Sequence, residues 1–255
     1  MIPDSYTRRA RIYPALLAAL PGLALAATMV SWRDLGISHL IATTAAGVLL
    51  YAFGDLTRRL GKRHEDAIYR EIGGKPSTAM LRHSDTTFGD ATKTSWFKYV
   101  GSKIGGIRPT AEKEEADQAA SDSYYERCGN WLRENTRDHK KFNLVFEENV
   151  AYGFRRNLYG LKWLGLALNV LVLVICAIWV WNRWPVGHDD GVAARLSYVI
   201  IVALAHALFF IFAVTKAGII EAANQYARQL LLACETLATG VPVKKAVTQR
   251  QKTKV

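Results

Sequence analysis

The stretch "ENVAYGFRRNLYGLKWLGLALNVLVLVICAIWVW", from Glu148 to Trp181, decides the fold of this chain. It begins with aromatic and basic residues, and its part from Leu161 to Trp181 carries a single charged residue, Lys162. An apolar helix of about 20 residues is long enough to cross the hydrocarbon of a bilayer. The stretch therefore predicts a membrane span that is directly preceded by Arg155 and Arg156.

Three more apolar blocks occur in the chain of 255 residues, and the charged residues are concentrated between them. They run from about Ile12 to Trp32, from Leu35 to Phe53 and from Leu196 to Thr215. A soluble protein would instead space its apolar residues at helical or strand periods. We therefore predict an all-α membrane protein with four transmembrane helices, arranged as two hairpins that extend into a mostly helical cytoplasmic domain.

The first block also fits the start of a cleaved signal peptide, because Arg8, Arg9 and Arg11 precede it. Its apolar part is longer than the central region of a signal peptide, and another apolar block follows after a short turn. A membrane hairpin is the favoured interpretation, and cleavage of the first span is the alternative.

Basic residues lie on one side of all four blocks, and such residues favour the cytoplasmic side of a membrane. The connections on the other side, around Arg33 and Asp34 and between Asn182 and Arg195, are short or balanced in charge. Both termini are therefore expected in the cytoplasm. The flanking basic residues are Arg8, Arg9, Arg11, Arg58, Arg59, Lys62, Arg63, Arg155, Arg156, Lys162, Lys216 and those of the C-terminal tail.

These blocks divide the chain into a first hairpin (1–54), a cytoplasmic domain (55–160), a second hairpin (161–216) and a C-terminal helix with a basic tail (217–255). Gly73 and Gly74 are expected to end a helix that continues from the second span. The segment before Leu161 is expected to enter the third span with little or no break, with Gly153 and Gly160 as points where it can kink.

Two further helices are expected. Thr110 is a suitable N-cap for a helix that runs to about Thr136, with glutamates near its positive end. Its apolar stripe would contain Ala116, Ala120, Tyr124 and Cys128. The C-terminal helix is expected to continue from the fourth span, and steps of four and three residues give it a coiled-coil-like seam that needs a partner: Ile219, Ala223, Tyr226, Leu230, Ala233 and Leu237.

Sequence motifs of known catalytic chemistry are missing. The string "GGKPST" departs from a phosphate-binding P-loop, because Tyr69 stands where the first Gly belongs and Pro76 follows Lys75. A helix end followed by a turn is the simpler interpretation, although the Gly amides and Lys75 could contact an anion. The histidines do not cluster, and the three cysteines are far apart. We therefore expect no enzyme, no metal site and no cofactor.

Basic and aromatic residues alternate in the predicted cytoplasmic domain. Such surfaces bind nucleotides or single-stranded nucleic acid by phosphate pairing and base stacking. They also suit anionic lipid headgroups, or are simply solvated, and these alternatives stay open. The candidate ligand-binding residues are Lys75, Arg82, His83, Trp96, Arg127, Arg133, Arg137, Lys140 and Lys141.

Polar residues inside the predicted spans are uncharged. Such groups are costly in lipid and usually face a partner or a water path. They therefore indicate either contacts between helices or the lining of a pore, and a pore would need an oligomer because four spans do not readily enclose a conduit. The residues are His39, Thr43, Thr44, Asn169 and His206.

Two spans, a charged helical domain, and two spans followed by a C-terminal helix form a layout that resembles a known family. It is similar to the four-transmembrane pore-forming effectors found beside nucleotidyltransferases in bacterial anti-phage systems. The resemblance covers the whole chain at the level of architecture. It implies an inner-membrane homo-oligomer in contact with lipid, gated by a nucleotide or oligonucleotide, with a partner protein encoded nearby.

The leading functional hypothesis is therefore an ion-channel-like pore, gated through its basic cytoplasmic domain. In this hypothesis Arg155, Arg156 and Lys162 couple that domain to the membrane helices, beyond their role in topology. The alternative is a membrane scaffold that recruits a cytoplasmic partner.

Overall fold

The computed structural model describes residues 3–29, 39–182 and 191–240. Within these ranges the chain forms helices joined by turns, without a strand, so the predicted all-α class is confirmed. The helices form two compact units. Unit 1 comprises residues 1–72 and 149–223, and unit 2 comprises residues 73–148 and 224–255.

Three helical segments of unit 1 are long and apolar enough to cross a membrane: Ser5–Thr28, Lys162–Asn182 and Arg195–Ala213. The first contains α1 (Ser5–Thr7), the π-helix η1 (Arg8–Ile12) and α2 (Tyr13–Met29). The second is α9 (Lys162–Asn182), and the third joins α10 (Gly191–Leu208) to the π-helix η2 (Phe209–Ala213). These segments confirm the first, third and fourth predicted apolar blocks as candidate spans.

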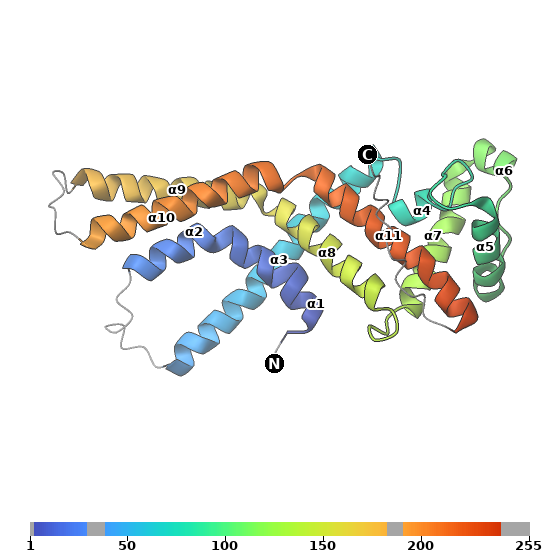
Figure 1. Cartoon of the computed structure of the whole chain (residues 1–255), viewed down its shortest axis with the longest axis horizontal. Coiled ribbons are helices and arrows are strands. Elements are labelled where there is room, and N and C mark those ends of the chain that lie inside the picture. The colour runs from blue at the N-terminus through green and yellow to red at the C-terminus, as the bar shows by residue number, and fades with distance from the viewer. Residues whose placement is uncertain (1–2, 30–38, 183–190, 241–255) are drawn as a thin grey trace, which may run out of the picture. The chain divides into compact units, whose positions relative to one another are not determined.

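Helices α2, α9 and α10 lie alongside one another (Figure 1). Val172 and Cys176 of α9 pack against Leu196 and Val199 of α10 in a buried cluster. On the outside, large apolar side chains are exposed, as expected for surfaces that face lipid. They include Leu16, Leu20, Leu171, Val174, Ile201 and Leu204.

The second predicted block, Leu35–Phe53, is not among the three candidate spans found in the described residues. Its first four residues lie outside the described ranges, and the rest begins the long helix α3 (His39–Glu71). Beyond the block, α3 continues as a charged helix, as predicted. Gly73 and Gly74 follow it with positive φ values of 81° and 132°, which glycine adopts most readily.

Helices α3 and α8 (Asn143–Gly160) cross in unit 1 with their backbones in close contact. A Cβ on Gly160 would lie 2.5 Å from the backbone nitrogen of Gly61, and a Cβ on Gly61 would lie 2.9 Å from the Cα of Asn157. Gly153 similarly leaves room for Tyr6. The glycines of α8 therefore permit close packing, which differs from the predicted role as kinks. A turn at Leu161 joins α8 to α9, so the third span is entered with little break, as predicted.

Unit 2 contains four helices from the middle of the chain and the last part of α11 (Lys216–Thr239). Its core is rich in aromatic residues, with Tyr125 fully buried and Trp96, Phe97 and Leu132 almost so. Leu230 and Leu231 of α11 complete this core. The four helices are α4 (Pro76–Ala79), α5 (Asp90–Ile104), α6 (Ala111–Ala116) and α7 (Gln118–Asn135).

The single helix predicted from Thr110 to Thr136 is wrong, because Asp117 divides it. Thr110 caps α6 as expected, but Asp117 leaves the helical conformation and accepts a hydrogen bond from the Ala120 amide at 2.9 Å. It thereby becomes the N-cap of α7, a position that aspartate favours. The restart turns Ala120 to the exposed side, while Tyr124 remains buried.

The predicted seam of α11 is buried or half-buried at all six positions. In unit 2 its partner is the core of the same chain, where Leu230 and Ala233 pack. The predicted continuation from the fourth span is interrupted: η2 ends at Ala213, and Val214 adopts φ −88° and ψ 88° before α11 begins. The fourth span and the C-terminal helix are therefore separate elements.

The crossing of α3 and α8 generates a test by substitution. Gly61→Ala forces a methyl group against the backbone of Asn157, and overpacking of this kind costs about 1–3 kcal/mol. We expect a clear fall in the Tm of the protein purified in detergent. Gly54→Ala, in the same helix, is the control: its Cβ would lie 3.9 Å from its nearest neighbours, and the better helix propensity of alanine should leave the Tm equal or higher. Equal Tm changes for the two variants would contradict the close crossing.

Candidate functional site

A cluster of buried and half-buried polar side chains joins α3 to α8 within unit 1. Arg156 is 7% exposed, and its Nη1 lies 2.9 Å from Oε2 of Glu65. The Tyr152 hydroxyl donates to the other carboxylate oxygen of Glu65 at 2.9 Å, and the Tyr69 hydroxyl lies 2.5 Å from that of Tyr152. We call these four residues and Asn157 the junction cluster. Each member forms a hydrogen bond or an ion pair with another member. Buried charge is tolerated when it is paired in this way.

Asn157 extends the junction cluster to the first apolar segment. Its Nδ2 donates to the Ala10 carbonyl at 2.6 Å, and the residue is fully buried. Pro14, four residues after Ala10, has no N–H, so this carbonyl lacks its normal α-helical donor. The amide of Asn157 therefore satisfies a carbonyl that a proline leaves free.

The same arrangement occurs one step further along the first segment. Pro21 lies inside α2 and removes the α-helical donor for the Leu17 carbonyl. Nε2 of His206 lies 3.1 Å from this carbonyl, while Nδ1 lies 3.0 Å from the side-chain nitrogen of Asn169. Since that nitrogen also donates to the Ala203 carbonyl at 2.7 Å, the geometry fits a neutral histidine that donates from Nε2. Asn169 and His206 thus connect α9, α10 and α2.

Asn169 and His206 were predicted to serve helix contacts or a pore lining. In the structure they are 2% and 5% exposed and make the contacts between helices described above. The backbone positions of His39, Thr43 and Thr44 belong to α3, but their side chains lie outside the described residues.

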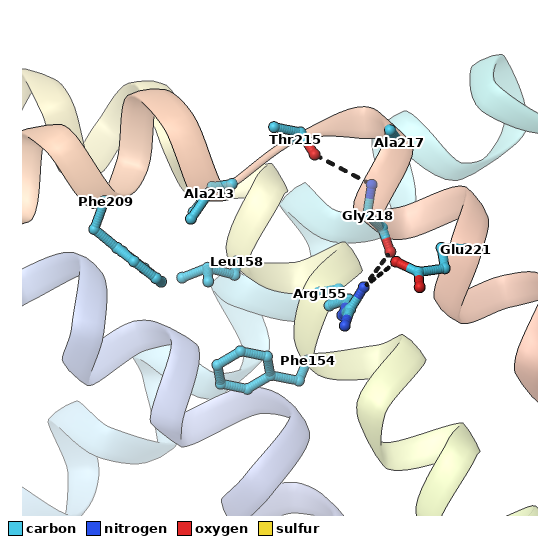
Figure 2. Close-up of a pocket in the computed structure, with 10 residues that line it drawn as sticks. Phe154, Arg155, Leu158, Phe209, Ala213, Thr215, Ala217, Gly218 and Glu221 are labelled. Carbon is cyan, nitrogen blue, oxygen red and sulfur yellow. Dashed lines mark hydrogen bonds and ion pairs between the residues drawn. The ribbon is translucent and has the colours of Figure 1, made fainter. Parts of the chain in front are cut away.

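The three predicted coupling residues all contact other elements of unit 1. Arg156 belongs to the junction cluster, while the exposed Arg155 contacts the first turns of α11, at the Gly218 carbonyl (3.1 Å) and Glu221 (3.0 Å) (Figure 2). Lys162 donates to the carbonyls of Val214 at 2.8 Å and Ile211 at 3.2 Å, where a cation stabilises the carbonyl end of a helix. Lys162 and Arg155 therefore contact the two sides of the break between η2 and α11, whereas Arg156 contacts α3.

Burial changes the pKa values of the junction cluster. Desolvation raises the pKa of Tyr69 to about 12, and it also raises the pKa of Tyr152. For Arg156 burial opposes the charged form most strongly, but Glu65, Tyr152 and Tyr6 together outweigh it and the pKa is raised. The cluster consequently holds a fixed ion pair beside two neutral phenols at physiological pH.

Three of the predicted ligand-binding residues make contacts within the fold of unit 2. Arg82 pairs with both carboxylate oxygens of Asp122, at 2.9 and 2.7 Å. The ring of His83 contacts the Pro109 carbonyl at 2.9 Å. Trp96 is 5% exposed and packs edge-on against Phe88, so its face is not available for a base.

The other basic candidates lie nearer the surface of unit 2. Lys75 pairs with Glu126 at 2.8 Å and precedes the short helix α4, which confirms the interpretation of "GGKPST" as a helix end and turn. Arg127 donates to the Ile104 carbonyl at the end of α5. Four of the candidates lie close to one another in sequence, at the end of α7 and in the turn after it. We call this group the basic turn: Arg133, Arg137, Lys140 and Lys141.

Sequence reasoning missed Glu65, Asn157 and Lys93. Lys93 is 1% exposed; its ammonium donates to the carbonyls of Arg82 and Asp85, and burial lowers its pKa. Glu65 and Lys93 occur in charged strings that resemble solvated helix surfaces. Asn157 could have been found from the prolines, since each free carbonyl in an apolar segment requires a polar partner elsewhere.

Compared with protein-family models, with curated proteins and with solved structures, the chain has no match. The geometry of its own residues therefore carries the functional argument.

The junction cluster predicts unequal effects of two neighbouring substitutions. Arg156→Gln leaves the half-buried carboxylate of Glu65 without its cation, and breaking a buried ion pair costs about 3–5 kcal/mol. Arg155→Gln removes an exposed pair, worth about 1 kcal/mol at most. Thermal unfolding in detergent should show a large loss of stability for Arg156→Gln and a small one for Arg155→Gln. Combining Glu65→Gln with Arg156→Gln should cost less than the sum of the two; additive losses would exclude the ion pair.

The raised pKa of Tyr69 predicts a loss of stability in alkali. Its contribution is complete below the ordinary value of 10.0 and is lost as the pH rises through about 12, because the folded state disfavours the phenolate. Tyr69→Phe should lower stability at neutral pH by about 1 kcal/mol and make the alkaline loss less steep. Tyr51→Phe, on the 81% exposed Tyr51 of the same helix, should leave the profile unchanged. Unfolding followed by circular dichroism across this pH range measures both, and parallel profiles for Tyr69→Phe and the parent would contradict the assignment.

Proposed function

We propose that this protein is an oligomeric, ion-conducting effector of the bacterial inner membrane, gated through unit 2 by an anionic nucleotide or oligonucleotide. The observation that supports it most directly is the junction cluster. It ties α8, whose earlier residues belong to unit 2, to α3 and to the first apolar segment of unit 1. A change in the position of α8 would therefore alter its contacts with α3 and with the first apolar segment.

The second link of the proposal is α11, which also has residues in both units. In unit 1 it is held to α8 by Arg155 and to α3 by the ion pair between Lys216 and Glu71. The two helices shared by the units are therefore connected to each other beside the ends of the apolar segments. Coupling in this proposal runs through these contacts, with Arg155, Arg156 and Lys162 as coupling residues.

The proposed ion path lies between copies of the chain. Helices α2, α9 and α10 use Asn169 and His206 for internal contacts and expose apolar side chains, so they suit lipid or protein contacts better than water. We assign the lining to the first part of α3, which contains His39, Thr43 and Thr44 and would be a span in addition to the three candidates. Several copies are needed, since one such helix cannot enclose a path.

The resemblance to nucleotidyltransferase-linked effectors supplies the biological part of the proposal: membrane depolarisation in anti-phage defence, with a partner protein encoded nearby. The second candidate function is a membrane scaffold that recruits a cytoplasmic partner. It is favoured by the hydrogen bonds that Asn169 Nδ2 and His206 make within the chain. Potassium efflux from liposomes that contain the purified oligomer distinguishes the two, because a scaffold releases no potassium under any stimulus.

The basic turn predicts where the ligand binds. Replacing Arg133, Arg137 and Lys141 together by Glu should abolish binding of a short, fluorescein-labelled single-stranded oligonucleotide while membrane insertion is retained. Removing single members should reduce the slope of log affinity against log salt by about 0.7 each, the value for one phosphate contact on a single strand.

The control for this experiment is a second triple reversal on exposed lysines of unit 2: Lys98, Lys103 and Lys113 to Glu. It changes the net charge by the same amount. Equal losses of binding in both triple variants would show that binding depends on net charge alone. Binding that is retained in the first variant would exclude the basic turn as the ligand site.

Four spans predict that both termini lie on the same side of the membrane, whereas three spans place them on opposite sides. Fluorescent-protein and alkaline-phosphatase fusions at each end measure this directly. We expect cytoplasmic fluorescence from both ends and phosphatase activity from neither. Opposite behaviour of the two ends would exclude α3 as a membrane span.

A further inference from the structure

A pocket of about 580 Å³ opens in unit 1 between α8 and the break that separates η2 from α11. This volume is within the range of small-molecule sites. Its wall divides by polarity (Figure 2). Phe154, Leu158 and Phe209 form an apolar side, while Arg155 and Glu221 lie on the other side.

The pocket lies at the end of a candidate span. Ala213, in its wall, is the last residue of the apolar segment Arg195–Ala213, and Lys162, which begins the segment after α8, donates to the carbonyl of Val214 in the same wall. Where the segment Arg195–Ala213 crosses a membrane, the apolar side would face the hydrocarbon edge and the charged side the headgroup region. A lipid is the ligand whose chemistry matches both sides.

The two charged residues of the wall have opposite sign, so the pocket carries no net charge from the side chains that line it. Arg155 and Glu221 are 47% and 67% exposed and lie 3.0 Å apart. Exposed pairs of this kind contribute about 0.2–1 kcal/mol, and ligand groups can therefore replace them at little cost. The matching ligand has one anionic and one cationic group close together.

We propose that this pocket binds the headgroup of a phosphatidylethanolamine lipid. Arg155 binds the phosphate, Glu221 accepts hydrogen bonds from the ethanolamine ammonium, and the start of an acyl chain packs against Phe154, Leu158 and Phe209. The charge pattern selects among lipids. An anionic glycerol headgroup would bring a phosphate near Glu221 without a cation to match it, and a choline headgroup has no N–H to donate. This inference rests on the pocket and on the candidate span beside it, and it does not depend on ion conduction.

Native mass spectrometry of the delipidated full-length protein tests the proposal, with phosphatidylethanolamine, phosphatidylglycerol and phosphatidylcholine added separately. The parent should bind the ethanolamine lipid most tightly. Arg155→Gln should weaken its binding about tenfold, the effect of one lost charge-assisted hydrogen bond. Glu221→Gln should weaken ethanolamine lipid binding and strengthen phosphatidylglycerol binding, so that the preference is reversed.

The matched control is the exposed ion pair between Asp55 and Arg59 on α3, with N and O 2.7 Å apart, which does not line the pocket. Asp55→Asn and Arg59→Gln should leave the lipid preference unchanged. Three results would overturn the proposal: a parent that prefers phosphatidylglycerol, a preference unaffected by Glu221→Gln, or an equal effect of the control pair. Competition by soluble glycerophosphoethanolamine at the affinity of the lipid would also overturn it, because the apolar wall would then contribute nothing.

Discussion

The packing of unit 1 depends on two carbonyl groups that prolines leave without donors. Pro14 and Pro21 remove the α-helical partners of the Ala10 and Leu17 carbonyls in a segment that is otherwise apolar. A polar group without a partner is costly in such surroundings. Side chains from two other helices, Asn157 and His206, satisfy them.

Those two hydrogen bonds determine which helices can be neighbours of the first segment and in which register. Asn157 fixes α8 against η1, and His206 fixes α10 against α2. Shifting either helix by one residue would break the hydrogen bond, because it moves the donor side chain about 1.5 Å along the helix axis and rotates it about that axis. The junction cluster is built on the first of these contacts, since Arg156 donates to the side-chain oxygen of Asn157. The fold and the candidate functional site therefore share one origin.

Features that depend on neighbours in sequence could be predicted. The apolar blocks around Lys162–Asn182 and Arg195–Ala213, the helix end at Gly73 and the N-cap at Thr110 all follow from length or local backbone chemistry. The interruption at Asp117 is also local, but the glutamates and alanines around it favour a helix, and only the cap geometry shows that the chain restarts there.

Features that depend on tertiary packing could not be read from the sequence in the same way. Arg82 and Trp96 belong to a basic, aromatic string that suggests a binding surface, yet Trp96 packs in the core of unit 2 and Arg82 pairs with Asp122. Glu65 lies 91 positions from Arg156 in the chain, and no sequence spacing connects them. The members of the basic turn lie within nine positions of one another in the chain, so their proximity does not depend on tertiary packing. They therefore remain candidates for one ligand-binding group.

The crossing of Gly61 and Gly160 has a mechanical consequence. Two helices whose backbones touch cannot move closer at that point, and the buried side chain of Asn157 fills the space beside Gly61. The distance between α3 and α8 is therefore set by the glycines. Their angle is held by contacts one turn away, where Arg156 and Tyr152 bind Glu65.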